Sequence, residues 1–184
     1  MKKKQLRHVI VDSLREIIFG LEDSLVSTLG AVTGIAVGTG STYIVILSGL
    51  VLIAAESTSM AAGSYLSSKV SAEAKHTGKK RVSEPVEEHG SPVRAGAVMW
   101  FFYFIGGFVP LSPYFFLSTQ QALWPSIVLT AVSLYLVGAW SAKYTGRSKV
   151  KSGMEMVSVS IAAALVGFII GRLVSAYFGI DVAA

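Results

Sequence analysis

The sequence predicts an all-α integral membrane protein with five transmembrane helices, the N-terminus inside and the C-terminus outside. Three observations indicate this class. Hydrophobic residues make up 52% of the 184 residues and charged residues only 15%, and the mean hydropathy is +0.60, well to the apolar side of a soluble domain. Five apolar runs are each long enough to cross a bilayer. The connections between these runs alternate in charge.

The length of the chain leaves room for a single membrane domain over residues 1–184. An amphipathic segment at 5–18 predicts a short interfacial helix that runs into the first span. A polar stretch at 69–94, broken by prolines and a glycine, predicts a short cytoplasmic loop, although residues 68–76 can extend the second helix beyond the membrane. The five spans are expected at about residues 17–37, 43–67, 96–117, 123–140 and 154–178.

The charge distribution supports this layout and argues against nucleic-acid binding. The net charge is +5 and the pI is near 9.5, but the basic residues lie almost wholly in short segments between apolar runs. They occupy the N-terminal arm and the second and fourth connections, whereas the first and third connections carry none. Such alternation predicts an N-inside, C-outside topology in contact with membrane lipid. The absence of cysteine excludes disulfides and thiolate metal ligands.

A polar hairpin formed by the first two spans points to the function. Glu22, Asp23 and Glu56 lie inside hydrophobic sequence, and a carboxylate at bilayer depth costs roughly 2.5–3.5 kcal/mol on insertion scales. These side chains therefore need a partner, a proton or a bound cation. Asp23 and Met60 are expected at the same depth, ~9 and ~10 Å from the inner ends of antiparallel spans, with Glu56 ~16 Å in, near the midplane.

A carboxylate level with a thioether, with no His or Cys in the spans, predicts a weak site for a borderline divalent cation such as ferrous iron. Other interpretations of these residues stay open. Met60 can simply pack the core, and Asp23 can make a structural hydrogen bond. Glu22 points about 100° away from Asp23 and is the less secure ligand, because it can pair with a basic residue near the inner surface.

Two motifs in this hairpin resemble a known family. The sequences GLEDSLVSTLGAVTG at 20–34 and SMAAGSYLSSK at 59–69 are similar to the signature of the vacuolar iron transporter family. The resemblance implies a homodimer of five-span subunits that exports ferrous iron, and often manganese, from the cytoplasm in exchange for protons, along a path between the two first helices. It also implies that Asp23 and Met60 match the family's first-span aspartate and second-span methionine, both linked there to metal passage.

The chain departs from the family pattern in several places. Plant members carry a second-span glutamate where this chain has Leu52, and Glu56, one turn further on, is the candidate substitute. Many members have a glutamate where this chain has Ser64. Eukaryotic members hold a helical metal-binding domain between spans two and three, but the connection at 69–94 is too short for one, so a prokaryotic cell membrane is the expected location. The loop sequence EPVEEH at 84–89 can gather a cation weakly, although solvated charge is its default role.

The leading hypothesis is therefore a proton-coupled divalent metal exporter without a resident cofactor, in which the metal ion is the cargo. Asp23 and Met60 form the inner site and Glu56 passes the ion on. The alternative is a membrane scaffold or assembly protein whose buried acids are paired structurally, which predicts no dependence on ions. An enzyme is not expected, because every histidine lies outside the spans and no nucleophile and base lie together in them.

Overall fold

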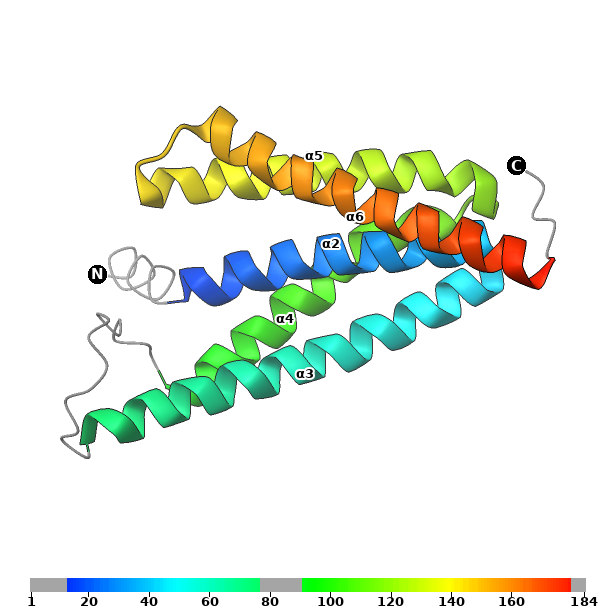
Figure 1. The fold of residues 1–184 in the computed structure, drawn as a ribbon. Coiled ribbons are helices and arrows are strands. Elements are labelled where there is room, and N and C mark those ends of the chain that lie inside the picture. Colours follow the sequence, from blue (N-terminus) through cyan, green and yellow to red (C-terminus); the bar gives the residue numbers. More distant parts are fainter. Residues whose placement is uncertain (1–12, 77–90, 180–184) are drawn as a thin grey trace.

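The structure is a computed structural model that describes residues 13–76 and 91–179. These residues form helices and short connections without any strand (Figure 1). The elements are α2 (Leu14–Thr39), α3 (Thr42–His76), α4 (Pro92–Leu111), the 3-10 helix η1 (Ser112–Phe115), α5 (Thr119–Thr145) and α6 (Lys149–Phe178). In the described chain five helices are long and apolar enough to cross a membrane, which confirms the predicted all-α, five-span class.

The helices extend beyond the expected apolar runs at several ends. Residues 14–18, expected in an interfacial helix, begin α2. Residues 69–76 end α3, which is the extension of the second helix that the sequence allowed. Apolar sequence shows where a helix meets lipid, whereas its hydrogen-bonded backbone continues into water through good helix formers such as Ala, Glu and Lys. The remainder of the expected interfacial helix, and the loop at 77–90 with its EPVEEH sequence, lie outside the described residues.

A tight turn joins α2 to α3. Gly40 ends α2 in the left-handed conformation, with φ of 62°, and its N–H donates to the carbonyl of Ala36 at 2.9 Å. Glycine adopts this conformation without the steric cost of a Cβ. Because α3 begins only two residues later, at Thr42, the two helices are antiparallel and adjacent at the end predicted to face outward.

α2 occupies the centre of the bundle. It lies between α6 on one side and α4 on the other, while α3 packs mainly on α4 and α5 on α6 (Figure 1). A buried apolar cluster fills the outer half of the bundle, between α2, α3, α4, η1 and α5; its members are Val32, Ala36, Val45, Ile53, Leu111, Tyr114 and Ala122. This core fixes the outer ends of α2 and α3.

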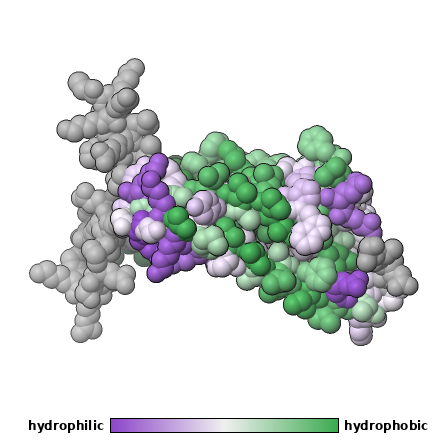
Figure 2. Space-filling model, turned by 90° about the horizontal axis from the view of Figure 1, so that it is seen from above, coloured by the Kyte–Doolittle hydropathy of each residue, from purple (hydrophilic) through white to green (hydrophobic). Residues whose placement is uncertain are grey.

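The molecular surface has the character of a protein embedded in lipid. Hydrophobic residues cover the middle of the face shown in Figure 2, and hydrophilic residues gather toward both ends. The outward side of α6 is a strip of exposed large apolar side chains, among them Leu165, Phe168, Ile169 and Leu173. An apolar band of this extent would be unfavourable in water and suits the hydrocarbon core of a bilayer.

Candidate metal-binding site in the membrane

Three helices each contribute one polar side chain to a hydrogen-bonded network inside the bundle. The hydroxyl of Tyr103 on α4 donates to Oε2 of Glu56 on α3. The hydroxyl of Ser27 on α2 lies 3.2 Å from the same carboxylate oxygen and 2.8 Å from the Tyr103 hydroxyl. Because the single phenolic proton is directed at Glu56, Ser27 shares its own proton between the two neighbouring oxygens. The network fixes the Glu56 carboxylate through Oε2.

The second oxygen of Glu56 has a different environment. No hydrogen bond to Oε1 is made by the residues that the structure describes. Tyr103 itself is fully buried, with none of its surface exposed, so the donor that holds Oε2 is shielded from lipid and water. The carboxylate is thus oriented by one oxygen, while the other remains available to a proton or a cation.

Asp23 lies one turn before Ser27 on α2, on the side that faces this network. Its carboxylate is close enough to Glu56 and Tyr103 to interact with them electrostatically. Glu22 is its neighbour in the chain, and both acidic side chains are partly buried. In the described part of the chain neither forms a hydrogen bond or an ion pair with a basic residue.

Two carboxylates in this position create a local excess of negative charge. In the low dielectric of a membrane protein the repulsion between such groups is much stronger than in water. A proton on one carboxylate, or a divalent cation between the two, would relieve it. The negative charges of Asp23 and Glu56 therefore favour a proton or a cation near them.

Met60 lies one turn after Glu56 on α3, toward the predicted inner side. It lines a cavity of about 360 Å³ between the inner parts of α2, α3 and α4, together with Glu16 and Met99. Asp23 does not belong to the lining of this cavity. Glu16 contributes a carboxylate to the same cavity as Met60.

Tyr103, Glu16 and Met99 were not among the site residues predicted from the sequence. Glu16 precedes Asp23 by seven residues, two helical turns, and this spacing was a usable signal that both acids lie on one face of α2. Tyr103 and Met99 are also one turn apart on α4, but nothing in a single span shows which neighbouring helix it faces. Their partners become visible only once α4 is placed against α2 and α3.

The described helices bring together few side chains of the types that usually bind metal ions. No group of three or more His, Cys, Asp or Glu side chains that could hold a metal ion occurs within residues 13–76 and 91–179. A pair of carboxylates supplemented by hydroxyl or thioether groups binds more weakly than a closed four-ligand site. Such an arrangement suits an ion that enters and leaves.

The fold and the site together define a five-helix membrane protein with acidic side chains buried between its spans. The sequence profile of the VIT family matches residues 14–90 and 77–172, and the chain belongs to this family. The resemblance seen in the sequence is thereby confirmed.

Three relatives illustrate the range of similarity. "Vacuolar iron transporter 1" of Arabidopsis thaliana is 24% identical, over 88% of this chain and 86% of that protein. An uncharacterised protein of Methanocaldococcus jannaschii is 26% identical, over 86% of this chain and 88% of its own length. A match to "Vacuolar iron transporter 1" of Tulipa gesneriana is 33% identical but spans only 39% of this chain and 30% of that protein.

Proposed function

We propose that this protein moves a divalent metal ion, ferrous iron first and manganese second, out of the cytoplasm of a prokaryotic cell in exchange for protons. The observation that carries the proposal is the pair formed by Asp23 and Glu56, which has no basic partner in the described chain. The names of the relatives, which are vacuolar iron transporters, support metal transport. The metal ion is the cargo, and no resident cofactor takes part.

Charge balance suggests how transport is coupled. A divalent cation bound between Asp23 and Glu56 compensates two negative charges, and so do two protons. Where the proton concentration is high, protonation of both carboxylates removes the attraction for the cation and releases it. On the cytoplasmic side the carboxylates lose their protons and bind the next ion. A change in access between the two sides, driven by these differences in binding, completes the cycle.

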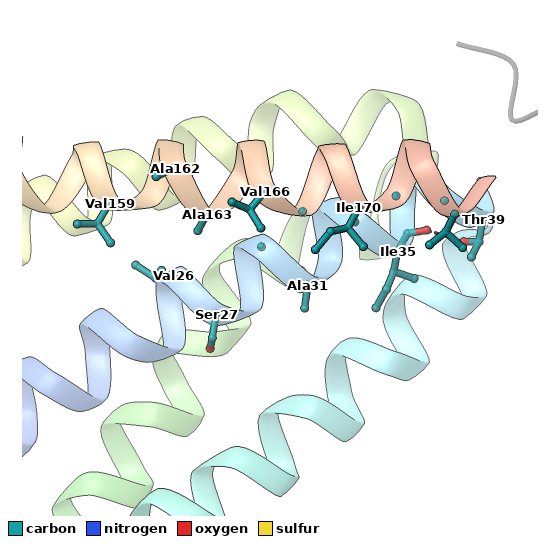
Figure 3. Close-up of a pocket in the computed structure, with 16 residues that line it drawn as sticks. Val26, Ser27, Ala31, Ile35, Thr39, Val159, Ala162, Ala163, Val166 and Ile170 are labelled. Atoms are coloured by element: carbon teal, nitrogen blue, oxygen red, sulfur yellow. Dashed lines mark hydrogen bonds between the residues drawn. The ribbon is translucent and has the colours of Figure 1, made fainter. Parts of the chain in front are cut away.

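The outward half of the path lies along α2 in this proposal. A groove of about 800 Å³ runs between α2 and α6 (Figure 3). On α2 its lining extends from Val26 to Thr39. Ser27 belongs both to this groove and to the Glu56 network. A second copy of the chain packed along α2 would close the groove toward lipid, which is why we favour a homodimer.

Met60 and Glu22 complete the proposed set of residues. Met60 offers a thioether sulfur on the inner side of Glu56, one turn away on α3, where it favours ferrous iron over magnesium or calcium. Glu22 adds negative charge next to Asp23 and attracts cations to the inner end of the path. It is the less essential of the two acids, because it lies on a different face of α2.

One observation favours a second candidate function. The hydrogen bonds from Tyr103 and Ser27 already satisfy one oxygen of Glu56, as expected if the buried acid only ties α2, α3 and α4 together. In a membrane scaffold of this kind, Asp23 and Glu56 would be structural, and neither the ion composition nor the removal of their charge would change activity.

Flux into proteoliposomes that contain a pH-sensitive dye distinguishes the two functions. Purified protein is reconstituted, ferrous iron or manganese is added outside, and metal uptake and internal pH are recorded together. The transporter predicts metal uptake with opposing proton movement, lost in Asp23→Asn and Glu56→Gln and weakened for iron in Met60→Ala. Glu155→Gln is the matched control, because Glu155 is exposed and ion-paired with Arg147 at 2.8 Å. Flux no greater than in empty liposomes, from folded protein, would refute transport and favour the scaffold.

A further inference from the structure

The inner cavity that contains Met60 combines features of a binding site in its own right. Its volume is about 360 Å³, and α2, α3 and α4 all contribute to its lining. The polar and sulfur-bearing groups in the lining include Glu16, Ser59, Met60, Ser64, Ser67 and Met99. One carboxylate, two thioethers and several hydroxyls therefore face one space on the side predicted to meet the cytoplasm.

Glu16 is the feature that points to a ligand. Its side chain is buried, with 4% of its surface exposed, and its Oε2 atom has no hydrogen-bond partner among the described residues. An isolated carboxylate removed from water loses its hydration, which is unfavourable unless a cation or a hydrogen-bond donor replaces that water. Arg15 also lines the cavity but is exposed and forms no ion pair with Glu16 in the described chain.

The glycines around the cavity make room for sulfur and for a ligand. Gly20 lies one turn after Glu16 on α2, and a Cβ there would be 3.3 Å from Sδ of Met99 and equally close to the α4 backbone at the Met99 carbonyl oxygen and the Tyr103 nitrogen. The absence of a side chain at Gly20 thus lets α4 pack closely on α2 and brings the Met99 sulfur to the face of α2 that carries Glu16. On the opposite wall, a Cβ at Gly63 would meet no atom within 4 Å, so the space in front of α3 is open.

We propose that this cavity is a capture site for a borderline divalent cation such as ferrous iron or cobalt(II), with Glu16, Met60 and Met99 as ligands. Carboxylate oxygen supplies the charge, and two thioethers favour softer transition ions over magnesium and calcium. Serine hydroxyls and water complete the coordination. Glu16 precedes Asp23 by ~10 Å along α2, so the site fills before the Asp23–Glu56 pair. Its role in transport rests on the proposed function, whereas the binding itself does not.

Equilibrium binding tests the site without any transport. Cobalt(II) is titrated by calorimetry into detergent-purified protein in which Asp23→Asn and Glu56→Gln have removed the deeper pair. One cobalt ion is expected to bind, and adding Glu16→Gln should weaken that binding by roughly 10- to 100-fold or more, since loss of a ligand costs at least as much as loss of a ligand's supporting partner. The matched control is Glu73→Gln, because Glu73 is an exposed acid near the end of α3. Unchanged affinity in the Glu16→Gln protein would overturn the proposal.

The thioethers are tested by ion selectivity. Met99→Leu keeps the volume of the side chain and removes only the sulfur, so it should reduce the affinity for cobalt(II) and cadmium(II) but not for manganese(II). Met154→Leu is the control, because Met154 is 55% exposed on α6 and lies outside the cavity. Equal losses for all three ions in Met99→Leu would show that Met99 is packing and not a ligand.

Thermal stability and transport measurements distinguish the capture site from a structural role of Glu16 and from the proposed transport function. If Glu16 were purely structural, Glu16→Gln would lower the thermal midpoint of the metal-free protein, and that result would also count against the site. If reconstituted protein transports no metal but Glu16-dependent cobalt binding persists, the proposed function fails and the capture site stands. If transport is intact and Glu16→Gln changes neither its KM for iron nor cobalt binding, the capture site fails and the transporter stands.

Discussion

The two halves of α2 differ sharply in how they pack. In the outer half, Gly34 lies so close to α6 that a Cβ would be 3.0 Å from the carbonyl oxygen of Gly167, and a Cβ on Gly167 would overlap the backbone at Gly30. In the inner half, the same helix faces buried acids and a cavity, and the opposite wall at Gly63 meets nothing within 4 Å. The outer half thus packs its backbone directly on α6, whereas the inner half packs on α4 at Gly20 and also borders a cavity that contains a buried carboxylate.

This difference indicates where stability and function are concentrated. Glycines that let two helices touch are typical of membrane interfaces, where the packing of backbone atoms drives association. Here they join α2 to α6 within one chain, a seam that we define as Gly30, Gly34, Gly38, Gly167 and Gly171. Buried carboxylates without a partner destabilise a fold. They lie along the inner half of α2, outside the seam that holds α2 to α6.

The largest effect is expected from filling the seam. Gly167→Leu introduces a side chain where the Gly30 backbone already lies, and overpacking of this kind should cost about 3 kcal/mol or more. The variant should yield little folded protein, measured by size-exclusion chromatography and thermal unfolding in detergent.

Gly63→Leu is the matched control for this change. It makes the same substitution in a helical glycine that faces open space, so the protein should fold normally. The larger side chain should instead fill the inner cavity and reduce metal uptake. If Gly63→Leu unfolded the protein as severely as Gly167→Leu, the contrast between the two halves of α2 would be wrong.

The next largest effect falls on transport and leaves the fold intact. Glu56→Gln keeps the shape of the side chain and its capacity to accept a hydrogen bond from Tyr103, but removes the charge. Metal flux into proteoliposomes should fall by roughly 100-fold, which corresponds to about 2.8 kcal/mol of lost interaction with the ion. The thermal midpoint should be unchanged or higher, because one buried charge is gone. A large drop in the midpoint together with retained flux would contradict this.

The sequence predicted the architecture well, for physical reasons. Each span must bury its backbone hydrogen bonds inside a helix and present about 20 apolar residues to lipid, and both requirements leave a clear pattern in composition. Gly167 and Gly171 form a GxxxG pattern in the sequence, and both pack against α2 of the same chain. The extension of the second helix over residues 68–76, which the sequence left open, occurs, because α3 continues to His76.

The site was less accessible to sequence reasoning. Asp23, Glu56 and Glu22 stand out because a charged residue in a span is rare. Tyr103 does not stand out, because tyrosine is common in membrane helices, and its hydrogen bond to Glu56 depends on how α4 packs against α3. Depth along a helix can be calculated from residue number, but the direction in which a helix faces cannot, so the sequence alone did not place Glu16 in one cavity with Met60.

A smaller effect on metal flux is expected when a buried tyrosine is replaced by phenylalanine. Tyr103 and Tyr114 provide a comparison, because only Tyr103 donates a hydrogen bond to Glu56. Tyr103→Phe removes the donor to Glu56, and a hydrogen bond to a charged group is worth about 1.5–3 kcal/mol. At the lower end of this range, metal flux should fall by roughly tenfold. In Tyr114→Phe the lost hydroxyl has no hydrogen-bond partner among the described residues, so flux should be unchanged and stability equal or slightly higher. Equal losses of flux in the two variants would show that Tyr103 acts through packing and not through Glu56.

The smallest effect is expected from Gly63→Ala, and its sign is informative. Gly63 lies inside α3, and a glycine within a helix is less stable than alanine by about 0.5–1 kcal/mol. Because the added Cβ would meet no atom within 4 Å, nothing offsets this gain, and the thermal midpoint should rise slightly. A single methyl group occupies little of a cavity of about 360 Å³, so metal uptake should remain close to that of the unmodified protein. A lower midpoint would mean that the space before Gly63 is filled in the membrane by another part of the assembly, and the open half of α2 would then be an interface.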